Sequence, residues 1–474
     1  MTREPATVIV GAGPAGVRAA QTLVRHGVRP LVIDEAPRWG GQIYRQQPPG
    51  FERPITQLYG FEAGRARAIH DTFEDLLPHV DYLPGQLVWN AGPRHLDLWH
   101  ATGNRYTQVA WRDVILATGA TDRILPVPGW TTPGVYALGG AQIALKFQGC
   151  AIGRDVVFAG SGPLLYLVAY QYRKAGARVR AVLDYATPGE QLRAVPAMTR
   201  LPAVLAKGLY YVAWLRAHGV PVHQGAQLVS VDGETSVSAV RWQPRGSDDV
   251  RTIACDALGF GYGLRPEHQL ADLLGCRFVF DALQRAHLVE QDRGVTSVPG
   301  VYVAGDGARI LGADGAERAG ERAALQLLAQ RGVHRDNARL AALDTELSRI
   351  EQFRTGIERA FPFPQDWAAQ VSDDTLVCRC EAVTAGDIRD TVATLGADEI
   401  NRVKALCRLG MGRCQGRMCG AAGAEIVAHA CGKPLDRIGR LRGQAPIKPV
   451  PISAFAEDDI TEPRATVAAE VSHG

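Results

Sequence analysis

The sequence predicts an α/β fold in which two nested Rossmann-like units precede a small helical domain. A strand–glycine turn–helix–strand pattern covers residues 7–35, and the same pattern recurs over 155–184. A further buried strand at 300–306 follows the second unit. Strands and helices that alternate at this length predict parallel sheets with right-handed crossovers. The strand at 300–306 indicates that the second unit is inserted into the first.

The predicted organisation has five parts. They are a nucleotide-binding unit at 1–122 and 288–335, an inserted NAD(P)-binding-like unit at 123–287, a helical linker at 336–375, a cysteine-rich domain at 376–432 and an extended tail at 433–474. Within the inserted unit, the apolar stretch 201–219 is interpreted as a core helix rather than as a surface for a partner.

The composition argues against several classes of protein. A formal net charge of +3 over 474 residues is too small to indicate binding to nucleic acid or to an anionic membrane. No signal peptide is recognisable, and no apolar run is long enough to cross a bilayer. We therefore expect a cytoplasmic protein, which is compatible with peripheral association at the inner membrane. In that setting the nine cysteines favour metal binding over a disulfide framework.

The first glycine motif predicts a dinucleotide site. Gly11, Gly13 and Gly16 match G-x-G-x-x-G between a strand and a helix, with Pro14 and Ala15 at the variable positions. Such glycines permit a tight turn, close approach of a pyrophosphate and close packing of helix on strand. Glu35 ends the next strand, where a carboxylate can accept hydrogen bonds from ribose hydroxyls. The alternative is an ordinary glycine-rich turn.

Three further segments favour a flavin as the ligand of this site. They are Thr118 and Gly119 at the end of a strand, Gly305 and Asp306 at the end of another, and Gly41 and Gln42 in a tight turn. Asp306 can accept hydrogen bonds from a ribityl chain, although a helix N-cap is the alternative. The turn at Gly41 is equally explained as a structural turn.

Together these motifs resemble the flavoproteins with two dinucleotide domains, the glutathione-reductase and thioredoxin-reductase group. The resemblance covers residues 1–330 and implies FAD at the first glycine motif. No closely spaced pair of cysteines lies near either glycine motif, unlike in the disulfide reductases, so dithiol chemistry is not expected. Cys150, Cys255 and Cys276 are isolated in the sequence, and we expect them to be buried small apolar residues.

The second glycine motif departs from the dinucleotide pattern. Gly160 and Gly162 begin it, but Leu165 occupies the position of the third glycine. A side chain there pushes helix and strand apart or shifts the turn. Asp184 ends the following strand and would favour NAD over NADP. We therefore expect a retained fold that does not bind NAD(P).

Four cysteines predict a metal or iron–sulfur site. Cys378 and Cys380 form a C-x-C pair, and Cys414 and Cys419 follow after a gap of 33 residues. The alternatives are a zinc site, a [2Fe–2S] cluster or unligated thiols. The gap is predicted to be helical and the second pair follows Gly-Met-Gly, which favours the cluster over a zinc ribbon. Cys407 and Cys431 are interpreted as structural.

The cysteine spacing resembles the bacterioferritin-associated-ferredoxin (BFD) type of [2Fe–2S] domain. The phrase C-R-C-E…G-M-G-R-C-Q-G-R-x-C is similar to a narrower group, the α subunits of heteromeric bacterial amine and amino-acid dehydrogenases. That group includes opine oxidase and hydrogen cyanide synthase subunits and D-hydroxyproline dehydrogenase, with the sarcosine oxidase α subunit more distant. The phrases TGATDRILPVPGWTTPGVYALGGAQ, AGSGPLLYLVA and PIKPVPI extend the resemblance over nearly the whole chain.

The resemblance implies that the substrate lies on another chain. A partner β subunit of the D-amino-acid-oxidase type would oxidise a C–N bond with its own FAD and pass electrons to this chain and on to the respiratory chain or a dye. It also implies that an adenine nucleotide can replace FAD in the first site, that FMN can lie at the subunit interface and that a small ferredoxin-like γ subunit can be present. In agreement, no catalytic constellation for a substrate is recognisable. The rival hypotheses are a self-sufficient NAD(P)H-dependent reductase and a scaffold that binds nucleotide and zinc.

Overall fold

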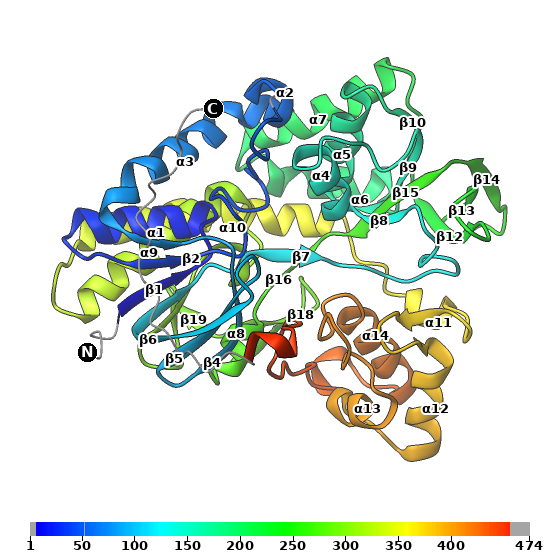
Figure 1. Cartoon of the computed structure of the whole chain (residues 1–474). Coiled ribbons are helices and arrows are strands. Elements are labelled where there is room, and N and C mark those ends of the chain that lie inside the picture. The colour runs from blue at the N-terminus through cyan, green and yellow to red at the C-terminus, as the bar shows by residue number, and fades with distance from the viewer. Residues whose placement is uncertain (1–5, 52, 456–474) are drawn as a thin grey trace.

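The computed structural model describes residues 6–51 and 53–455. Figure 1 shows three parts, which are a unit around a large sheet, a second unit around a smaller sheet and a small helical domain. The large sheet has nine strands, in the order β19-β20-β21-β6-β1-β2-β3, with β4 and β5 extending from β6. Its strands are β1 (Ala6–Val10), β2 (Leu31–Ile33), β3 (Asp81–Leu83), β4 (Gln86–Gly92), β5 (His95–His100), β6 (Arg105–Leu116), β19 (Gln291–Asp292), β20 (Val295–Thr296) and β21 (Val301–Val303).

Two helices form the closest pair on this sheet. The helix α1 (Pro14–Arg25) follows β1, and α9 (Ala313–Gln330) follows β21 and packs along α1. Alanines on both helices are buried at their contact, so the two backbones approach closely. The helices α2 (Ile55–Tyr59) and α3 (Ala63–Leu76) complete this layer. Because β1 lies between β2 and β6, the turn after β1 opens at the carboxyl edge of a parallel sheet, where ligands bind in such folds.

The second unit is a five-stranded parallel sheet in the order β11-β10-β9-β15-β8. Its strands are β8 (Val135–Ala137), β9 (Asp155–Ser161), β10 (Arg178–Asp184), β11 (Val222–Gln224) and β15 (Ala257–Tyr262). The helices of this unit are α4 (Leu138–Lys146), α5 (Pro163–Lys174), α6 (Pro188–Met198) and α7 (Pro202–Ala217). A separate three-stranded sheet contains β12 (Ala226–Asp232), β13 (Ala239–Pro244) and β14 (Arg251–Ala254). The chain enters through β7 (Ala120–Asp122) and leaves through β16 (Leu264–Pro266), and these two strands pair antiparallel. All the strands of this unit lie between β6 and β19 in the sequence, so the unit is inserted into the first.

The remaining elements connect the units. They are α8 (Gln269–Leu273), β17 (Phe278–Asp281), β18 (Ala286–Val289), the long helix α10 (Asn337–Ala360), which packs on α6 and α9, and α11 (Trp367–Gln370). The cysteine-rich domain contains β22 (Leu376–Cys378), β23 (Val383–Thr384), α12 (Ala385–Leu395), α13 (Ile400–Cys407) and α14 (Gly420–Cys431). Its core is continuous with that of the second unit. Two indoles cross the junction, since Trp130 donates to the carbonyl of Leu376 and Trp367 donates to that of Pro126.

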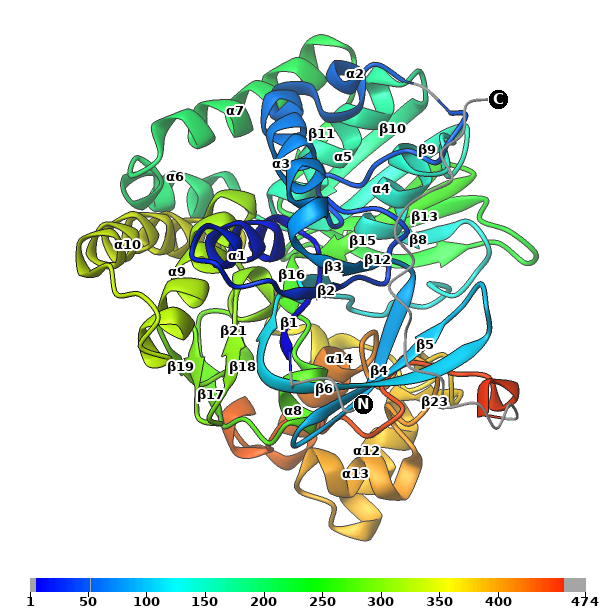
Figure 2. The same cartoon turned by 60° about the vertical axis from the view of Figure 1, so that its left-hand side comes forward.

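The last described segment returns to the first unit. It leaves the cysteine-rich domain and runs back to β4 and β6 (red in Figures 1 and 2). The amide of Ile447, a buried residue, donates to the carbonyl of Trp89 at 3.0 Å. Phe455 packs on the rings of Trp89 and Tyr106. This segment therefore connects the cysteine-rich domain to the first unit.

Two predictions about burial were wrong. The apolar stretch 201–219 forms α7, but only Tyr211 and Leu215 of that helix are buried, and Leu209 is 63% exposed. The helix packs with one edge mainly on α5, so its apolar composition did not place it in the core. Cys255 and Cys276 are buried as expected, whereas Cys150 is exposed in the loop after α4. Among the helices of the described ranges, none is long and apolar enough to cross a membrane.

Candidate cofactor sites

The first glycine motif forms the tight turn that its spacing predicts. Gly11 has a φ of +105°, and a Cβ on it would stand 2.3 Å from the carbonyl oxygen of Ala117 on the neighbouring strand. A Cβ on Gly16 would stand 1.8 Å from the carbonyl oxygen of Gly11, so helix α1 could not pack on the turn. With Pro14 at its start, α1 leaves backbone N–H groups free at its N-terminus. This geometry provides the positive end of a helix to a phosphate.

The structure brings the other predicted segments against this turn. A Cβ on Gly41 would stand 2.8 Å from the Cα of Gly13. A Cβ on Gly305 would stand 2.8 Å from the Cβ of Ala15. One residue beyond Asp306, a Cβ on Gly307 would stand 2.7 Å from Oγ1 of Thr118 and 3.3 Å from the amide nitrogen of Gly119. Four segments that are distant in sequence thus meet around one turn, with a glycine on at least one side of each contact.

The two acidic residues at the end of β2, Asp34 and Glu35, have different roles. Asp34 is buried and accepts hydrogen bonds from the amides of Ala12 and Ala36, which ties the glycine turn to the second strand. Burial raises the pKa of Asp34, and these hydrogen bonds oppose the shift. Glu35 has a side chain that is 61% exposed and forms an ion pair with Lys448 of the tail. Glu35 is therefore the carboxylate within reach of a ligand, and Asp34 is the structural one that the motif did not single out.

Asp306 and Gln42 make contacts of their own. One carboxylate oxygen of Asp306 accepts from the amides of Leu311 and Gly312, just before α9, at 2.8 and 2.9 Å. Burial raises the pKa of Asp306. Asp306 is not the N-cap residue of α9, which is Gly312, but it fixes the turn that leads into that helix, and these bonds engage only Oδ1. The side chain of Gln42 is exposed and accepts from Arg45.

The second glycine motif has the fold of a dinucleotide turn, but its carboxylate is already engaged. Leu165 is fully buried in the core between α5 and the sheet. Asp184 is fully buried and accepts from the hydroxyl of Tyr166 at 2.6 Å, from the amide of Ala186 and from Gln191. Burial raises its pKa to about 7. A carboxylate with three internal donors has little capacity left for a ribose.

The four predicted cysteines come together on one side of the cysteine-rich domain. Cys380 Sγ and Cys414 Sγ are 4.0 Å apart. The thiol of Cys419 is close enough to Cys378 and Cys414 to act on the pKa of both. The four thiols therefore form one group, in which Cys419 lies near Cys378 and Cys414. Within 6–51 and 53–455, no group of three or more His, Cys, Asp or Glu side chains is arranged to hold a metal ion.

The surroundings of these thiols favour the thiolate form of two of them. The hydrogen bond from Cys419 lowers the pKa of Cys378 to about 6, with help from the amides of Gly410, Glu381 and Cys380. The same donor lowers the pKa of Cys414 to about 5, with help from the amides of Met418 and Gly416. Thiolate is the form in which cysteine binds iron or zinc.

The loop that carries the second pair is built for close approach. A Cβ on Gly412 would stand 2.3 Å from the Cβ of Cys380, and a Cβ on Gly416 would stand 2.1 Å from a methyl carbon of Leu441. Gly410 and Gly416 have φ values of +79° and +80°. Glycine is required for this backbone path, so that amides rather than side chains face the sulfurs. Four thiols with surrounding amide donors are a donor set that fits an iron–sulfur centre.

A buried ion pair links the two predicted sites. Glu267 follows β16; its amide donates to the carbonyl of Gly119, and its carbonyl accepts from the hydroxyl of Thr118. Its carboxylate pairs with Arg417, which lies between Cys414 and Cys419 and also donates to the carbonyl of Ile447. Their side chains are 12% and 11% exposed. Burial alone would raise the pKa of Glu267, but the Arg417 charge outweighs it and the pKa is lowered.

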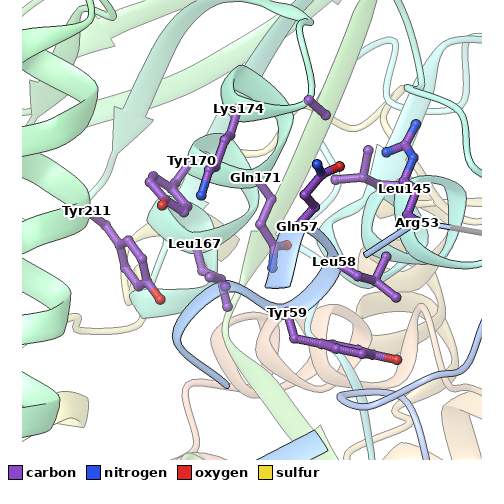
Figure 3. A pocket seen from close by; sticks show the side chains of 12 residues that line it. Arg53, Gln57, Leu58, Tyr59, Leu145, Leu167, Tyr170, Gln171, Lys174 and Tyr211 are labelled. Carbon is purple, nitrogen blue, oxygen red and sulfur yellow. The ribbon is translucent and has the colours of Figure 1, made fainter. Parts of the chain in front are cut away.

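A separate cavity of about 260 Å³ lies between α2 and the helices of the second unit. Figure 3 shows Tyr59, Tyr170 and Tyr211 around it, with Lys174 beside Tyr170 and Arg53 beside Leu145. No residue predicted to bind a cofactor lines this cavity.

The comparisons with known proteins agree with the fold and with a boundary between the nucleotide-binding units and the cysteine-rich domain. A sequence model of the family described as pyridine nucleotide-disulphide oxidoreductase matches residues 5–325. The sarcosine oxidase A3 domain matches residues 372–459, which include all four cysteines. The chain therefore belongs to the pyridine nucleotide-disulphide oxidoreductase family and is an oxidoreductase of a flavin-dependent kind.

Within that family the chain groups with subunits of heteromeric oxidases. It is 35% identical to hydrogen cyanide synthase subunit HcnB of Pseudomonas aeruginosa, over 94% of this chain and 97% of that protein. It is also 35% identical to an opine oxidase subunit of Agrobacterium tumefaciens, over 95% of this chain and 91% of that protein. The fold resembles that of L-proline dehydrogenase from P. horikoshii, with a TM-score of 0.68 at 20% identity over 96% of this chain and 79% of that one.

The sequence reasoning missed three residues at these sites. Asp34 was passed over in favour of Glu35, although the acidic pair at the strand end was a usable signal. Glu267 and Arg265 carry no motif, and they reach the cysteines only because β16 returns beside Gly119. Arg417 lies between two of the predicted ligands in the sequence but carries no motif of its own.

Proposed function

We propose that this chain is the electron-transferring subunit of a heteromeric amino-acid, amine or opine dehydrogenase. FAD would occupy the site at the first glycine motif, and a [2Fe–2S] cluster would be held by the four cysteines. The observation that carries the proposal is the direct connection of the two sites through Thr118, Glu267 and Arg417. Bound flavin would accept electron pairs and the cluster would pass electrons on singly, which is the chemistry that joins dehydrogenation to a one-electron acceptor.

The residues of this chain have distinct parts in the proposal. Gly11, Gly13 and Gly16 with the start of α1 would hold the pyrophosphate, and Glu35 would accept the ribose hydroxyls. Thr118, Gly119 and Asp306 would lie along the flavin. Cys378, Cys380, Cys414 and Cys419 would ligate the cluster, while the amides of the 410–418 loop would donate to its sulfurs.

The substrate would be bound by a partner. The relatives are named as subunits, of hydrogen cyanide synthase and of opine oxidase. In keeping with this, we propose that the partner is a D-amino-acid-oxidase-like FAD subunit that takes hydride from the C–H bond of the carbon bonded to nitrogen, so that the C–N bond becomes C=N. The engaged carboxylate of Asp184 supports electron entry from that partner rather than from NAD(P)H.

The first experiment tests the cofactors of the full chain purified without oxygen. We expect two irons and two acid-labile sulfides per chain, an EPR signal after reduction with dithionite, and FAD in the heat-released supernatant. Stoichiometric zinc without sulfide would reject the cluster. Release of ADP or ATP instead of FAD would reject the flavin assignment and leave the nucleotide site intact.

The second experiment tests the route of electrons. In stopped-flow mixing with NADH or NADPH, any bound flavin should stay oxidised on the timescale of turnover. Co-expression with a D-amino-acid-oxidase-like partner should create substrate-dependent dye reduction that the isolated chain lacks. Rapid bleaching by NADH, or full turnover by the isolated chain, would contradict the proposal.

A further inference from the structure

An arginine from the second unit lies against the proposed cluster site. Arg265 is in the middle of β16 and pairs with Thr121 of β7, so its backbone belongs to the crossing point of the two nucleotide units. Its guanidinium reaches the cysteine-rich domain. Nη1 is 3.4 Å from the position that a Cβ on Gly420 would take, and Gly420 directly follows Cys419.

The guanidinium is partly buried and incompletely paired. Nε of Arg265 is shielded from water and has no hydrogen-bond partner among the described residues. The nearby carboxylate of Glu267 is engaged by Arg417 instead. A buried charge without compensation is costly, so this site calls for negative charge in front of Arg265.

The cysteines are the source of that charge. Burial lowers the pKa of Arg265 and the charge of Arg417 adds to this effect, whereas Glu267, Cys419 and Cys414 act in the opposite direction. An arginine side chain remains protonated in proteins, so the guanidinium is a fixed positive charge. Its partial burial reduces the screening of this charge by water.

We propose that Arg265 sets the reduction potential of the iron–sulfur centre at Cys378, Cys380, Cys414 and Cys419 through its fixed positive charge. This inference rests on the proposed function. In a [2Fe–2S] centre, two ferric ions, two sulfides and four thiolates carry a net charge of about −2. One electron, from reduced flavin in the complex or from dithionite in a titration, reduces one iron and makes the net charge about −3. A cation at this place stabilises the reduced form more than the oxidised form and raises the potential.

The chain offers a matched control for the charge. Arg413 directly precedes Cys414 but is exposed, and Arg379 lies between the first two cysteines and is also exposed. Water and salt screen exposed charges. The position of Arg265 in another unit also means that the arrangement of the units, and not the cysteine-rich domain alone, decides the potential.

The test is a redox titration of the full chain followed by the EPR signal of the reduced cluster. Arg265→Gln should shift the reduction equilibrium on the order of tenfold towards the oxidised form, which corresponds to about 59 mV more negative for a one-electron couple. Arg265→Lys should recover most of this shift, and Arg413→Gln should give a much smaller one. Glu267→Gln removes a negative charge and should shift the potential in the positive direction.

Equal potentials in wild type and Arg265→Gln, or equal shifts in Arg265→Gln and Arg413→Gln, would overturn the inference while the cluster itself stands. If Arg265→Gln does not fold, Arg265→Met serves as the uncharged variant, and a potential equal to that of wild type in Arg265→Met overturns the inference. Absence of iron from the wild-type chain would overturn the proposed function and this inference together.

Discussion

The backbone of Gly41 lies directly on that of Gly13, so closely that a Cβ on Gly41 would stand 2.8 Å from the Cα of Gly13. Gly40 is tied to the same turn, because its amide donates to the carbonyl of Ala12 at 2.8 Å. The loop after β2 therefore closes over the start of α1. A nucleotide bound at the glycine motif would be enclosed by this contact.

Gly41→Ala should reduce the nucleotide content of the purified chain by tenfold or more. The methyl group would separate the loop from the glycine turn, and the φ of +66° adds strain. The measurement is adenine nucleotide or flavin released per chain. Gly27→Ala is the matched control, since Gly27 has a φ of +74° but no atom within 4 Å of its Cβ position. Both variants should lose about 1 kcal/mol of stability, and equal nucleotide loss in both would contradict a role for the contact.

Cys419→Ser should remove the iron–sulfur centre, because the thiol of Cys419 contacts two of the other three cysteines. Cys431→Ser should retain it, since Cys431 lies at the far end of α14 and faces the carbonyl of Ala397. Iron and acid-labile sulfide per chain are the measurements. Wild-type iron content in Cys419→Ser would show that the cysteines do not ligate a cluster.

Asp184→Asn should remove one source of pH dependence in stability. Burial raises the pKa of Asp184 to about 7, above the value of about 3.9 in an unfolded chain. The folded chain holds this proton more tightly, so the stabilisation is complete below about pH 4 and is lost as pH rises through about 7. The loss amounts to roughly 4 kcal/mol at most for a shift of this size. Melting temperatures from pH 5 to pH 8 should fall less in Asp184→Asn than in wild type.

Asp249→Asn is the control for this pH series, because Asp249 is 60% exposed by side chain and pairs only with Arg251 two residues away. A slope in Asp184→Asn identical to those of wild type and Asp249→Asn would mean that Asp184 is ionised throughout the range.

Lys448→Ala should leave stability within about 1 kcal/mol of wild type and should tighten nucleotide binding several-fold. The ion pair with Glu35 is partly exposed, and such pairs contribute little to stability. A nucleotide must compete with Lys448 for the Glu35 carboxylate. Isothermal titration with ADP measures the affinity. Lys433→Ala, which breaks the exposed pair with Asp398, is the control and should leave the affinity unchanged. Weaker ADP binding in Lys448→Ala would mean that the lysine contacts the nucleotide itself.

The sequence alone determined the local structures that depend on residue type and spacing. The turn at Gly11, Gly13 and Gly16 requires residues without a side chain, and strand–helix alternation requires a parallel sheet. These constraints act over a few residues, so they can be read from the chain. The return of a strand after the second unit likewise predicted the insertion that the sheet order confirms.

Tertiary structure decided which neighbouring side chains act at the sites. Asp34 and Glu35 are adjacent and chemically alike, yet one is buried under the glycine turn and the other faces the tail. The exposure of α7 could not be predicted from its composition. An apolar helix is normally buried, but the composition does not show whether the core of the same chain or a partner protein buries it. Glu267 and Arg417 are 150 residues apart and meet only because the inserted unit brings β16 back to the cysteine loop. Burial and charge pairing depend on the surrounding atoms, and in this protein those atoms come from distant parts of the chain.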